Sequence, residues 1–377
     1  MTVPGSSPFV NRPGAVVLPD AVDAGVPSHY GSPNIEQRML AAGEAIVDLS
    51  NRGIVSVAGP DRLSWLNSMT SAELTNLPVG ASSETLFLDP NGRLEHVAGI
   101  VDDGETTWLL VEADEVEPLV TWLNRMKFML RVEVADRSAE FARIGLMPSD
   151  SALDLAVASP NGVPLLWTDP WREVVAGGHQ YARGEHPSAG WRWTEVLVAR
   201  EELHLLAAGL LPVAGSLAAE ALRVAAWRPR KATEADEKTI PHELDWLRSA
   251  VHLTKGCYRG QETVAKVHNL GHPPRRLVLL HLDGSDSVLP KRTATVLADR
   301  NGEPVAVGVV TTAVMHHELG PIALAVIRRN IDPEARLTVD EDGISIAAAQ
   351  QVIVPADAGA VADVPRLPRL GAVRRNP

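Results

Sequence analysis

The strongest constraint on the fold is a change of pattern at Pro273-Pro274, after which short β-type runs alternate with turns. The runs cover residues 277–282, 293–297, 304–314, 322–327, 337–339 and 344–348. Short strands at close and regular spacing are typical of an antiparallel barrel or sandwich. The sequence therefore predicts a small β-barrel over residues 273–355.

The region before Pro273 mixes strands and helices. Residues 46–49 and 53–57 have strand patterns, and Pro60-Asp61 is a helix start signal before an amphipathic stretch. Residues 89–93 separate two strand-like runs, and their Asn-Gly pair supplies the positive φ angles of a tight hairpin. Hairpins among strands and helices favour an α+β fold over a purely parallel sheet.

The chain is too long for one ordinary core, since its 377 residues exceed the ~100–200 residues of a typical domain. Residues 1–35 lack a sustained period and predict an extended N-terminal lead-in. Residues 36–272 form the predicted α+β region, and the barrel follows it. Residues 356–377 are rich in Pro, Ala, Arg and Gly, which predicts a disordered tail.

The composition narrows the functional classes. The net charge of −12 argues against general binding to nucleic acid or to an anionic membrane. A single cysteine excludes an intrachain disulfide, and it cannot by itself hold an iron–sulfur cluster or a structural zinc ion. There is no signal-peptide pattern and no apolar run of the ~18 residues that a membrane span needs. We expect a cytoplasmic protein without a resident metal.

The one cysteine, Cys257, lies in the motif Lys255-Gly256-Cys257-Tyr258-Arg259-Gly260-Gln261-Glu262. Neighbouring cations and a helix N-terminus lower the pKa of a thiol, and both are expected here, because Lys255 and Arg259 flank the sulfur and a helical pattern begins at Gly260. Glycines let the backbone bend sharply or approach a ligand. The motif thus predicts an ionisable, accessible thiol, and the alternative is a buried, inert cysteine.

The surroundings of Cys257 are basic although the chain is acidic. Residues 255–276 carry five cations and one anion, a local charge of +4. This pattern favours a small anionic ligand or an acidic partner surface. An ordinary solvated helix face is the alternative.

The motif around Cys257 resembles the signature of folate-binding YgfZ-type proteins, which are relatives of the glycine-cleavage aminomethyltransferase. Four other segments are similar to that family and occur in the same order: residues 59–67, 89–93, 221–223 and 240–243. Val307–Thr312 is similar to the opening of the family's terminal barrel. The resemblance covers roughly residues 28–350.

The resemblance implies an aminomethyltransferase-like arrangement of three domains around a central pocket, with residues 36–272 forming two intertwined folate-binding domains. It further implies a tetrahydrofolate-dependent role in assembling or repairing iron–sulfur enzymes, with those enzymes or their assembly factors as partners. Cys257 is then the functional thiol. The implied folate-binding residues are Lys255, Gly256, Tyr258, Arg259, Gly260, Gln261, Glu262, Arg223, Trp227 and Glu243.

The chain departs from this family at the position that reads the pterin ring. Folate-binding relatives carry a carboxylate and then a glycine after the Leu-Arg pair, where this chain has Ala225 and Trp227. A carboxylate matches the pterin amide and amino groups through paired hydrogen bonds, which alanine cannot make. Either another acid such as Glu243 replaces it, or folate binding is weakened or altered. Trp227 stacks on a ring or simply packs in the core.

Two other functions remain open from the sequence. A folate-dependent aminomethyltransferase is the first, although the chain has Val111-Glu112-Ala113-Asp114 where those enzymes tend to carry an asparagine. A non-catalytic module that docks a client protein is the second. The latter predicts that Cys257→Ser leaves function intact.

Overall fold

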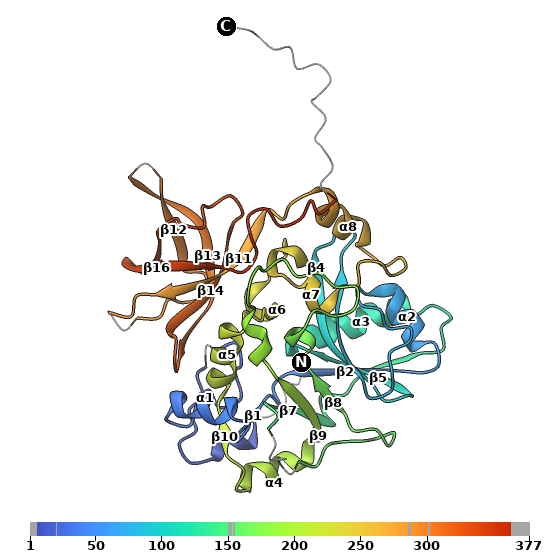
Figure 1. The fold of residues 1–377 in the computed structure, drawn as a ribbon. Coiled ribbons are helices and arrows are strands. Elements are labelled where there is room, and N and C mark those ends of the chain that lie inside the picture. Colours follow the sequence, from blue (N-terminus) through green and yellow to red (C-terminus); the bar gives the residue numbers. More distant parts are fainter. Residues whose placement is uncertain are drawn as a thin grey trace, which may run out of the picture.

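The computed structural model describes residues 6–362, apart from residues 20, 150–152, 154, 286, 287 and 301. Its strands form three sheets, one of them a closed barrel. Figure 1 shows the barrel on one side of the molecule and the sheet of β2 to β6 on the other, with short helices between them. The fold is therefore α+β, as the sequence predicts.

The first sheet is antiparallel and has the strand order β3 (Ser82–Leu88), β4 (Leu94–Asp102), β5 (Thr106–Val111), β2 (Gly53–Ala58) and β6 (Glu133–Asp136). Helices α2 (Arg62–Met69) and α3 (Val116–Met126) pack against its apolar residues. The turn between β3 and β4 is the predicted Asp-Pro-Asn-Gly hairpin, in which Gly92 has a φ of +75°.

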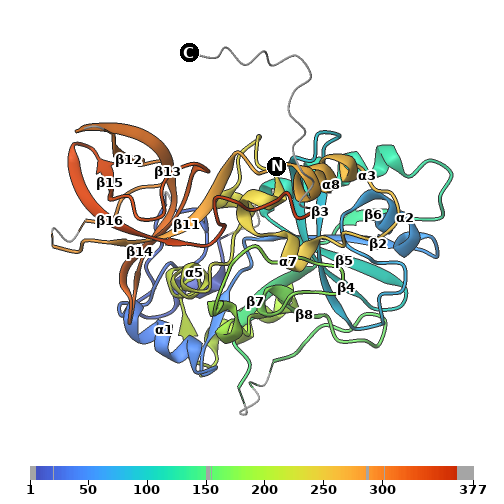
Figure 2. The ribbon, with the colours of Figure 1, turned by 45° about the horizontal axis from the view of Figure 1, so that its top comes forward.

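The second sheet has the order β10 (Val213–Ala214), β1 (Ile46–Asp48), β7 (Phe141–Leu146), β9 (Thr194–Ala199) and β8 (Leu166–Thr168). Only β10 and β1 run parallel among its pairs. Helices α1 (Pro33–Ala41) and α5 (Ser216–Ala225) pack together beside this sheet (Figure 2). Helix α4 (Leu203–Ala208) lies at its far end.

Short helices connect the two open sheets and the barrel. They are α6 (Lys231–Glu234), α7 (Leu247–Ala250) and α8 (Gln261–Leu270), with the 3-10 turn η6 (Pro241–Leu244) between α6 and α7. The other 3-10 turns are η1 (Pro8–Asn11), η2 (Ala113–Glu115), η3 (Pro170–Arg172), η4 (Pro187–Gly190) and η5 (Arg200–Glu202). No helix among the described residues is both long and apolar enough to span a bilayer.

The predicted barrel is confirmed. Its six strands close in the order β11 (Arg275–Leu282), β14 (Gly320–Arg328), β13 (Glu303–His316), β12 (Thr295–Arg300), β15 (Leu337–Glu341) and β16 (Ile344–Val352). Alternate side chains fill the interior, as the period of two in a strand requires. Val307–Thr312, which resembles the family's barrel opening, lies in β13. In chain order, β13 is the third of the barrel strands, after β11 and β12.

Both ends of the described chain contain more structure than the sequence suggests. The lead-in includes η1, whose Phe9 is fully buried, and a bridge that pairs Val16 with His29. Residues 356–362 also differ from the predicted disordered tail, because they pack on α8. There, Ala358 is buried, and the Val361 N–H donates to the His268 carbonyl.

We expect Gly308→Ala to destabilise the barrel by about 1–3 kcal/mol, because a Cβ at this position in β13 would lie 2.3 Å from the Val326 carbonyl oxygen. Gly190→Ala is the matched control, since its added Cβ meets none of the described atoms within 4 Å. Urea unfolding followed by circular dichroism measures both changes. Equal midpoints for the two variants would contradict the close packing of β13 on β14.

Candidate functional site

The loop that carries Cys257 is held at its end by the β3–β4 hairpin. Gly260, which precedes α8, has a φ of +84°, and a Cβ there would lie 2.6 Å from the Asp89 carbonyl oxygen. A Cβ at Gly92 would in turn lie 3.0 Å from Cβ of Thr263. Two sequence segments that are far apart in the chain therefore meet here, and the contact requires a glycine in the signature motif.

Lys255 is turned away from solvent and caps the end of α2. Its Nζ donates to the carbonyl oxygens of Asn67 at 2.7 Å and Thr70 at 2.9 Å, and to that of Ala72. Carbonyls at a helix C-terminus lack intrahelical partners, so a cation is favourable there. Burial lowers the pKa of Lys255 to about 8. Its interactions brace the loop.

Arg259 also has partners of its own. Its guanidinium pairs with the Glu95 carboxylate, with Nη2 3.1 Å from Oε1, and lies 5.7 Å from the ring centre of Trp122 on α3. Both groups of the ion pair are about one-third exposed, so the pair contributes little to stability. Arg259 therefore joins the thiol loop to β4 and α3.

Cys257 is exposed at the tip of this braced loop, and Gly256 beside it is exposed too. Tyr258 is buried, which raises its pKa, and its ring centre lies 5.4 Å from Lys255 Nζ. Gln261 closes the loop by donating from Nε2 to the Lys255 carbonyl at 3.1 Å. Glu262 is exposed in the first turn of α8. The sulfur is thus accessible, as predicted, but it does not line the central cavity.

The central cavity lies between the two open sheets and α5–α7 and has a volume of about 100 Å³. Its lining combines four tryptophans with six cations and six carboxylates. The tryptophans are Trp167, Trp191, Trp193 and Trp246, the cations are Arg52, Arg143, Arg223, Arg228, Arg230 and Lys231, and the carboxylates are Glu84, Glu112, Glu115, Asp169, Glu195 and Glu220. Equal numbers of opposite charges favour internal pairing.

Arg228 organises one wall of the cavity. Its Nη2 donates to Glu84, and its Nε donates to Asp169 at 2.8 Å. Glu84 also accepts from Trp246 Nε1 at 3.1 Å and from Ser249 Oγ at 2.7 Å. Burial raises the pKa of Glu84, and Arg228 opposes that rise. Because Trp246 and Ser249 belong to the α7 segment, this wall is continuous with the backbone that leads to Cys257.

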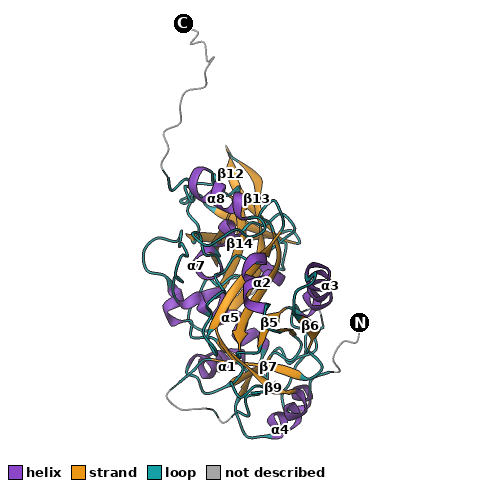
Figure 3. Ribbon diagram, turned by 90° about the vertical axis from the view of Figure 1, so that its right-hand side faces the viewer, coloured by secondary structure: helices purple, strands orange, loops and turns teal. Residues whose placement is uncertain are grey.

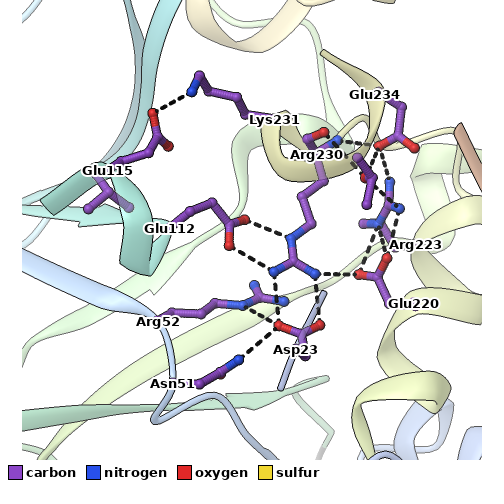
Figure 4. A network of polar contacts seen from close by, with 12 residues as sticks. Asp23, Asn51, Arg52, Glu112, Glu115, Glu220, Arg223, Arg230, Lys231 and Glu234 are labelled. Atoms are coloured by element: carbon purple, nitrogen blue, oxygen red, sulfur yellow. Dashed lines mark hydrogen bonds and ion pairs between the residues drawn. The ribbon is translucent and has the colours of Figure 1, made fainter. Parts of the chain in front are cut away.

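Arg230 organises the opposite wall and is the centre of the network in Figure 4. Its guanidinium binds Asp23 at 2.7 and 2.9 Å, Glu112 at 2.6 and 2.8 Å, and Glu220 at 3.3 Å. Burial raises the pKa of Asp23, but the charges of Arg230 and Arg52 outweigh burial and hold it far below its ordinary value. Burial also raises the pKa of Glu112, but the charges of Arg230 and Arg52 outweigh it and lower that pKa to about 2. These carboxylates are therefore ionised and paired.

Three charged groups in the lining keep atoms without a hydrogen-bond partner. Among the described residues, Nε of Arg52, Oε2 of Glu115 and Nη1 of Arg228 are buried and make no hydrogen bond, although Arg52 Nε lies 3.6 Å from Oδ1 of Asp23. The other oxygen of Glu115 already contacts Lys231 at 2.9 Å and His96 at 3.0 Å. Free buried donors and acceptors are costly in a folded protein, so the atoms of Glu115 and Arg228 are well placed to bind a ligand.

The remaining residues that the resemblance implies for folate binding do not lie together. Arg223 lines the cavity, but it pairs with Glu220 and Glu234, both at 2.8 Å. Glu243 lies outside the cavity lining and is fully buried against Arg275, so it does not replace the missing carboxylate. Trp227 is buried with a φ of +57° and packs edge-on against His186, also outside the lining.

Sequence reasoning missed most of the cavity residues. Arg228 and Arg230 lie in the run Trp227-Arg228-Pro229-Arg230-Lys231 directly after α5, which is a dense cluster of cations in an acidic chain. That cluster of cations is the sequence feature that could have identified Arg228 and Arg230 as cavity residues. Glu84, Asp169 and Asp23 offered none, because nothing in their local sequence indicates that they meet an arginine far along the chain.

Comparison with known proteins finds a family model that matches the N-terminal part of the chain. Residues 14–158 match the model of the GCVT N-terminal domain. A solved structure, the glycine cleavage system aminomethyltransferase T from Bartonella henselae, superposes with a TM-score of 0.70 at 17% identity, covering 92% of this chain and 96% of that one. The aminomethyltransferase-like fold is thus confirmed.

Curated relatives have different names. A chloroplastic protein of Arabidopsis thaliana described as a transferase is 26% identical, covering 69% of this chain and 61% of its own length. An aminomethyltransferase of Symbiobacterium thermophilum is 27% identical over 75% of this chain and 76% of its own length. The mitochondrial iron–sulfur cluster assembly factor IBA57 homolog of Mycosarcoma maydis is 25% identical over 69% of this chain and 66% of its own length.

This chain therefore spans about three-fifths of the chloroplastic relative and two-thirds of the IBA57 homolog. Its residues 14–158 match the GCVT N-terminal domain, and its relatives include aminomethyltransferases and a homolog of an iron–sulfur cluster assembly factor. Because the names of two relatives place them in organelles, a cytoplasmic location stays a prediction.

We expect Arg230→Met to lower the free energy of unfolding by about 3–5 kcal/mol, because it removes the one guanidinium that the buried carboxylates of Asp23, Glu112 and Glu220 share. Arg183→Met is the matched control, since its pair with Asp357 is largely exposed and is worth about 1 kcal/mol or less. Urea denaturation gives both values. Similar losses in the two variants would contradict the central role of Arg230.

A pH-dependent prediction concerns Asp245, which is fully buried just before α7 and accepts from the Tyr181 N–H at 2.6 Å. Burial raises its pKa from 3.8 to about 7. As the pH rises from about 4 to about 7, the unfolded chain releases this proton while the folded chain keeps it, so Asp245 reduces stability progressively over that interval.

We expect Asp245→Asn to remove this dependence. Its gain in stability over the native chain should grow by on the order of 3 kcal/mol between about pH 4 and pH 8. Urea midpoints measured across this range test it, with the exposed carboxylate of Asp332 tested as Asp332→Asn for comparison. A difference that stays constant with pH would disprove the assignment.

Proposed function

We propose that this chain, with its aminomethyltransferase-like fold and relatives, is an accessory factor that binds reduced folate and supports the assembly or repair of iron–sulfur enzymes through Cys257. The observation that carries this proposal is the placement of the single thiol. Cys257 is exposed, while the loop on both sides of it is fixed by Lys255 and Gly260. A merely structural cysteine gains nothing from such exposure, because free cysteines are among the most buried residues.

The iron–sulfur part of the proposal draws on the relatives and on thiol chemistry. One relative is named as an iron–sulfur cluster assembly factor homolog. An exposed thiol is suited to exchange with disulfides or to bind soft metal ions as its thiolate. Among the described residues, no group of three or more His, Cys, Asp or Glu side chains is arranged to hold a metal ion. The proposed iron–sulfur partner is therefore a client protein.

The central cavity is the proposed folate site. Its tryptophan rings offer flat apolar surfaces for a pterin, and the free oxygen of Glu115 offers the carboxylate that Ala225 does not. The free Nη1 of Arg228 suits an anionic or carbonyl group of the same ligand. A bound reduced folate would supply a carrier for a one-carbon unit.

The chemistry of the lining fits folate better than the space does. The cavity holds about 100 Å³, whereas small-molecule sites usually measure ~300–1,000 Å³. A whole folate therefore enters only if lining side chains move, and paired groups such as Arg228 and Glu84 resist that movement. We expect folate binding to be weaker than in a preformed pocket.

Aminomethyl transfer is the second candidate function, because several relatives carry that name and the fold matches. It requires the same cavity but gives no role to an exposed thiol outside it. A client-docking module without chemistry is the third. The response to loss of the thiol distinguishes these two functions from the leading proposal.

Two measurements test the two parts of the proposal separately. Titration of the native chain with tetrahydrofolate, followed by tryptophan fluorescence, should give saturable quenching because four tryptophans line the cavity. Cys257→Ser should bind equally, since the sulfur lies outside the lining. If the fluorescence is not quenched and calorimetry also detects no binding, the folate part of the proposal is wrong and the part that concerns the thiol still stands.

The thiol is tested in a strain that lacks this chain. Cys257→Ser, expressed at the native level, should restore less than about a tenth of the iron–sulfur enzyme activity that the native chain restores, because serine neither exchanges with disulfides nor binds soft metals comparably. Thr254→Ser, an exposed change in the same loop, is the control and should restore it fully. Full rescue by Cys257→Ser would overturn the role of the thiol and leave aminomethyl transfer and client docking as the remaining functions.

A further inference from the structure

The most exposed apolar protrusion near the thiol loop follows α3. We define the α3 tip as residues 126–130, Met-Lys-Phe-Met-Leu. Phe128 is 82% exposed and Met129 88% exposed, and Met126 and Leu130 are also exposed. Single exposed apolar residues are ordinary on protein surfaces, but contiguous apolar patches mark interaction sites. Four such residues in a five-residue segment therefore need an explanation.

The fold does not need apolar side chains at this tip. Phe128 and Met129 contribute to none of the apolar clusters of the described residues, in contrast to Leu119 and Leu123 on the buried face of α3. Met129 also has a φ of +54°, a left-handed conformation that glycine or asparagine adopts at lower cost. A strained residue that points a long apolar side chain into solvent suggests a role outside the fold.

The α3 tip is basic as well as apolar. Residues 125–131 contain Arg125, Lys127 and Arg131 and no acidic residue, in a chain whose net charge is −12. Arg131 is paired with Asp61 at 2.7 Å, which leaves Arg125 and Lys127 as the charges available to a partner. Apolar residues ringed by cations are complementary to an apolar pocket with an acidic rim.

The α3 tip and the thiol belong to the same side of the molecule. Arg259, two residues after Cys257, lies over Trp122 on α3. Trp122 is four residues before Met126, the last residue of α3, which is roughly 6 Å along the helix at 1.5 Å per residue, and Phe128 follows two residues later. Cys257 is at most about 7 Å from Arg259 along an extended chain. A typical interface of about 800 Å² per partner, roughly 30 Å across, spans both features.

We propose that the α3 tip is the docking site for the client protein on which Cys257 acts, and that the client presents an apolar pocket with an acidic rim. This inference rests on the proposed function and adds its docking surface. Phe128 and Met129 enter the pocket, since a rigid aromatic ring and an adaptable thioether are effective contacts. Arg125 and Lys127 face the acidic rim and speed association.

The probe for the test is the iron–sulfur enzyme that loses most activity in a strain lacking this chain, purified without its cluster. Its affinity for the native chain, for the Phe128→Ser/Met129→Ser variant and for Leu210→Ser is measured by calorimetry. Leu210 is the matched control because it is 99% exposed but follows α4, which lies at the other end of the molecule from α8 and the thiol loop (Figures 1 and 3). Both substituted sites are exposed, so the variants should fold normally.

We expect the dissociation constant of the Phe128→Ser/Met129→Ser variant to rise at least about tenfold, while Leu210→Ser stays within about twofold of the native chain. Arg125→Glu/Lys127→Glu should slow association and reduce its dependence on salt. In the deletion strain, the α3-tip variant should fail to restore the enzyme activity, and Leu210→Ser should restore it. Together these results support the inference.

The other outcomes overturn it in distinguishable ways. If the α3-tip variant binds and rescues normally while Cys257→Ser fails to rescue, the docking site is wrong and the proposed function stands. If no iron–sulfur enzyme loses activity without this chain, the function and its client are both wrong. If the α3 tip binds vesicles of phosphatidylserine and phosphatidylcholine but not the client, the surface is a membrane contact.

Discussion

The arrangement of this molecule depends on one buried guanidinium. Arg230 binds Asp23 from the N-terminal segment, Glu112 from the end of β5 and Glu220 from α5. Each of these ions would be costly to bury alone, and together they satisfy one another. The network continues through Arg223 and Glu234 to the barrel, where Thr311 and Thr312 donate to Glu234. The end of β5, helix α5, the N-terminal segment and the barrel strand β13 are thereby fixed around a single centre.

The same pairing determines what the central cavity offers. Most of its charged groups bind one another, so the lining is rigid and its volume small. Among the charged residues of that lining in the described structure, Arg52, Glu115 and Arg228 keep atoms without a hydrogen-bond partner. A fold that elsewhere has the architecture of an aminomethyltransferase thus combines a restricted cavity with an exposed thiol outside it. This separation is the physical reason for assigning ligand binding and thiol chemistry to different places.

Sequence reasoning succeeded where the determinants are local. The barrel was predictable because strand periodicity and turn residues act within a few positions, and the Asn91-Gly92 hairpin was predictable for the same reason. It did not foresee the contacts of Lys255, which lies two residues before Cys257 in the motif and donates to carbonyls at the end of α2. Adjacency along a chain does not fix the direction of a side chain. The ordered residues 356–362 were missed because their partners lie on α8.

The sequence by itself determined the α+β class, the barrel and the hairpin, because each depends on periodicity or turn geometry at close spacing. Only the tertiary structure decided that the thiol is exposed while its neighbouring cations are engaged elsewhere, and that Arg230 gathers carboxylates from distant segments. The reason is that ion pairs and burial depend on distances across the fold, which local sequence does not encode.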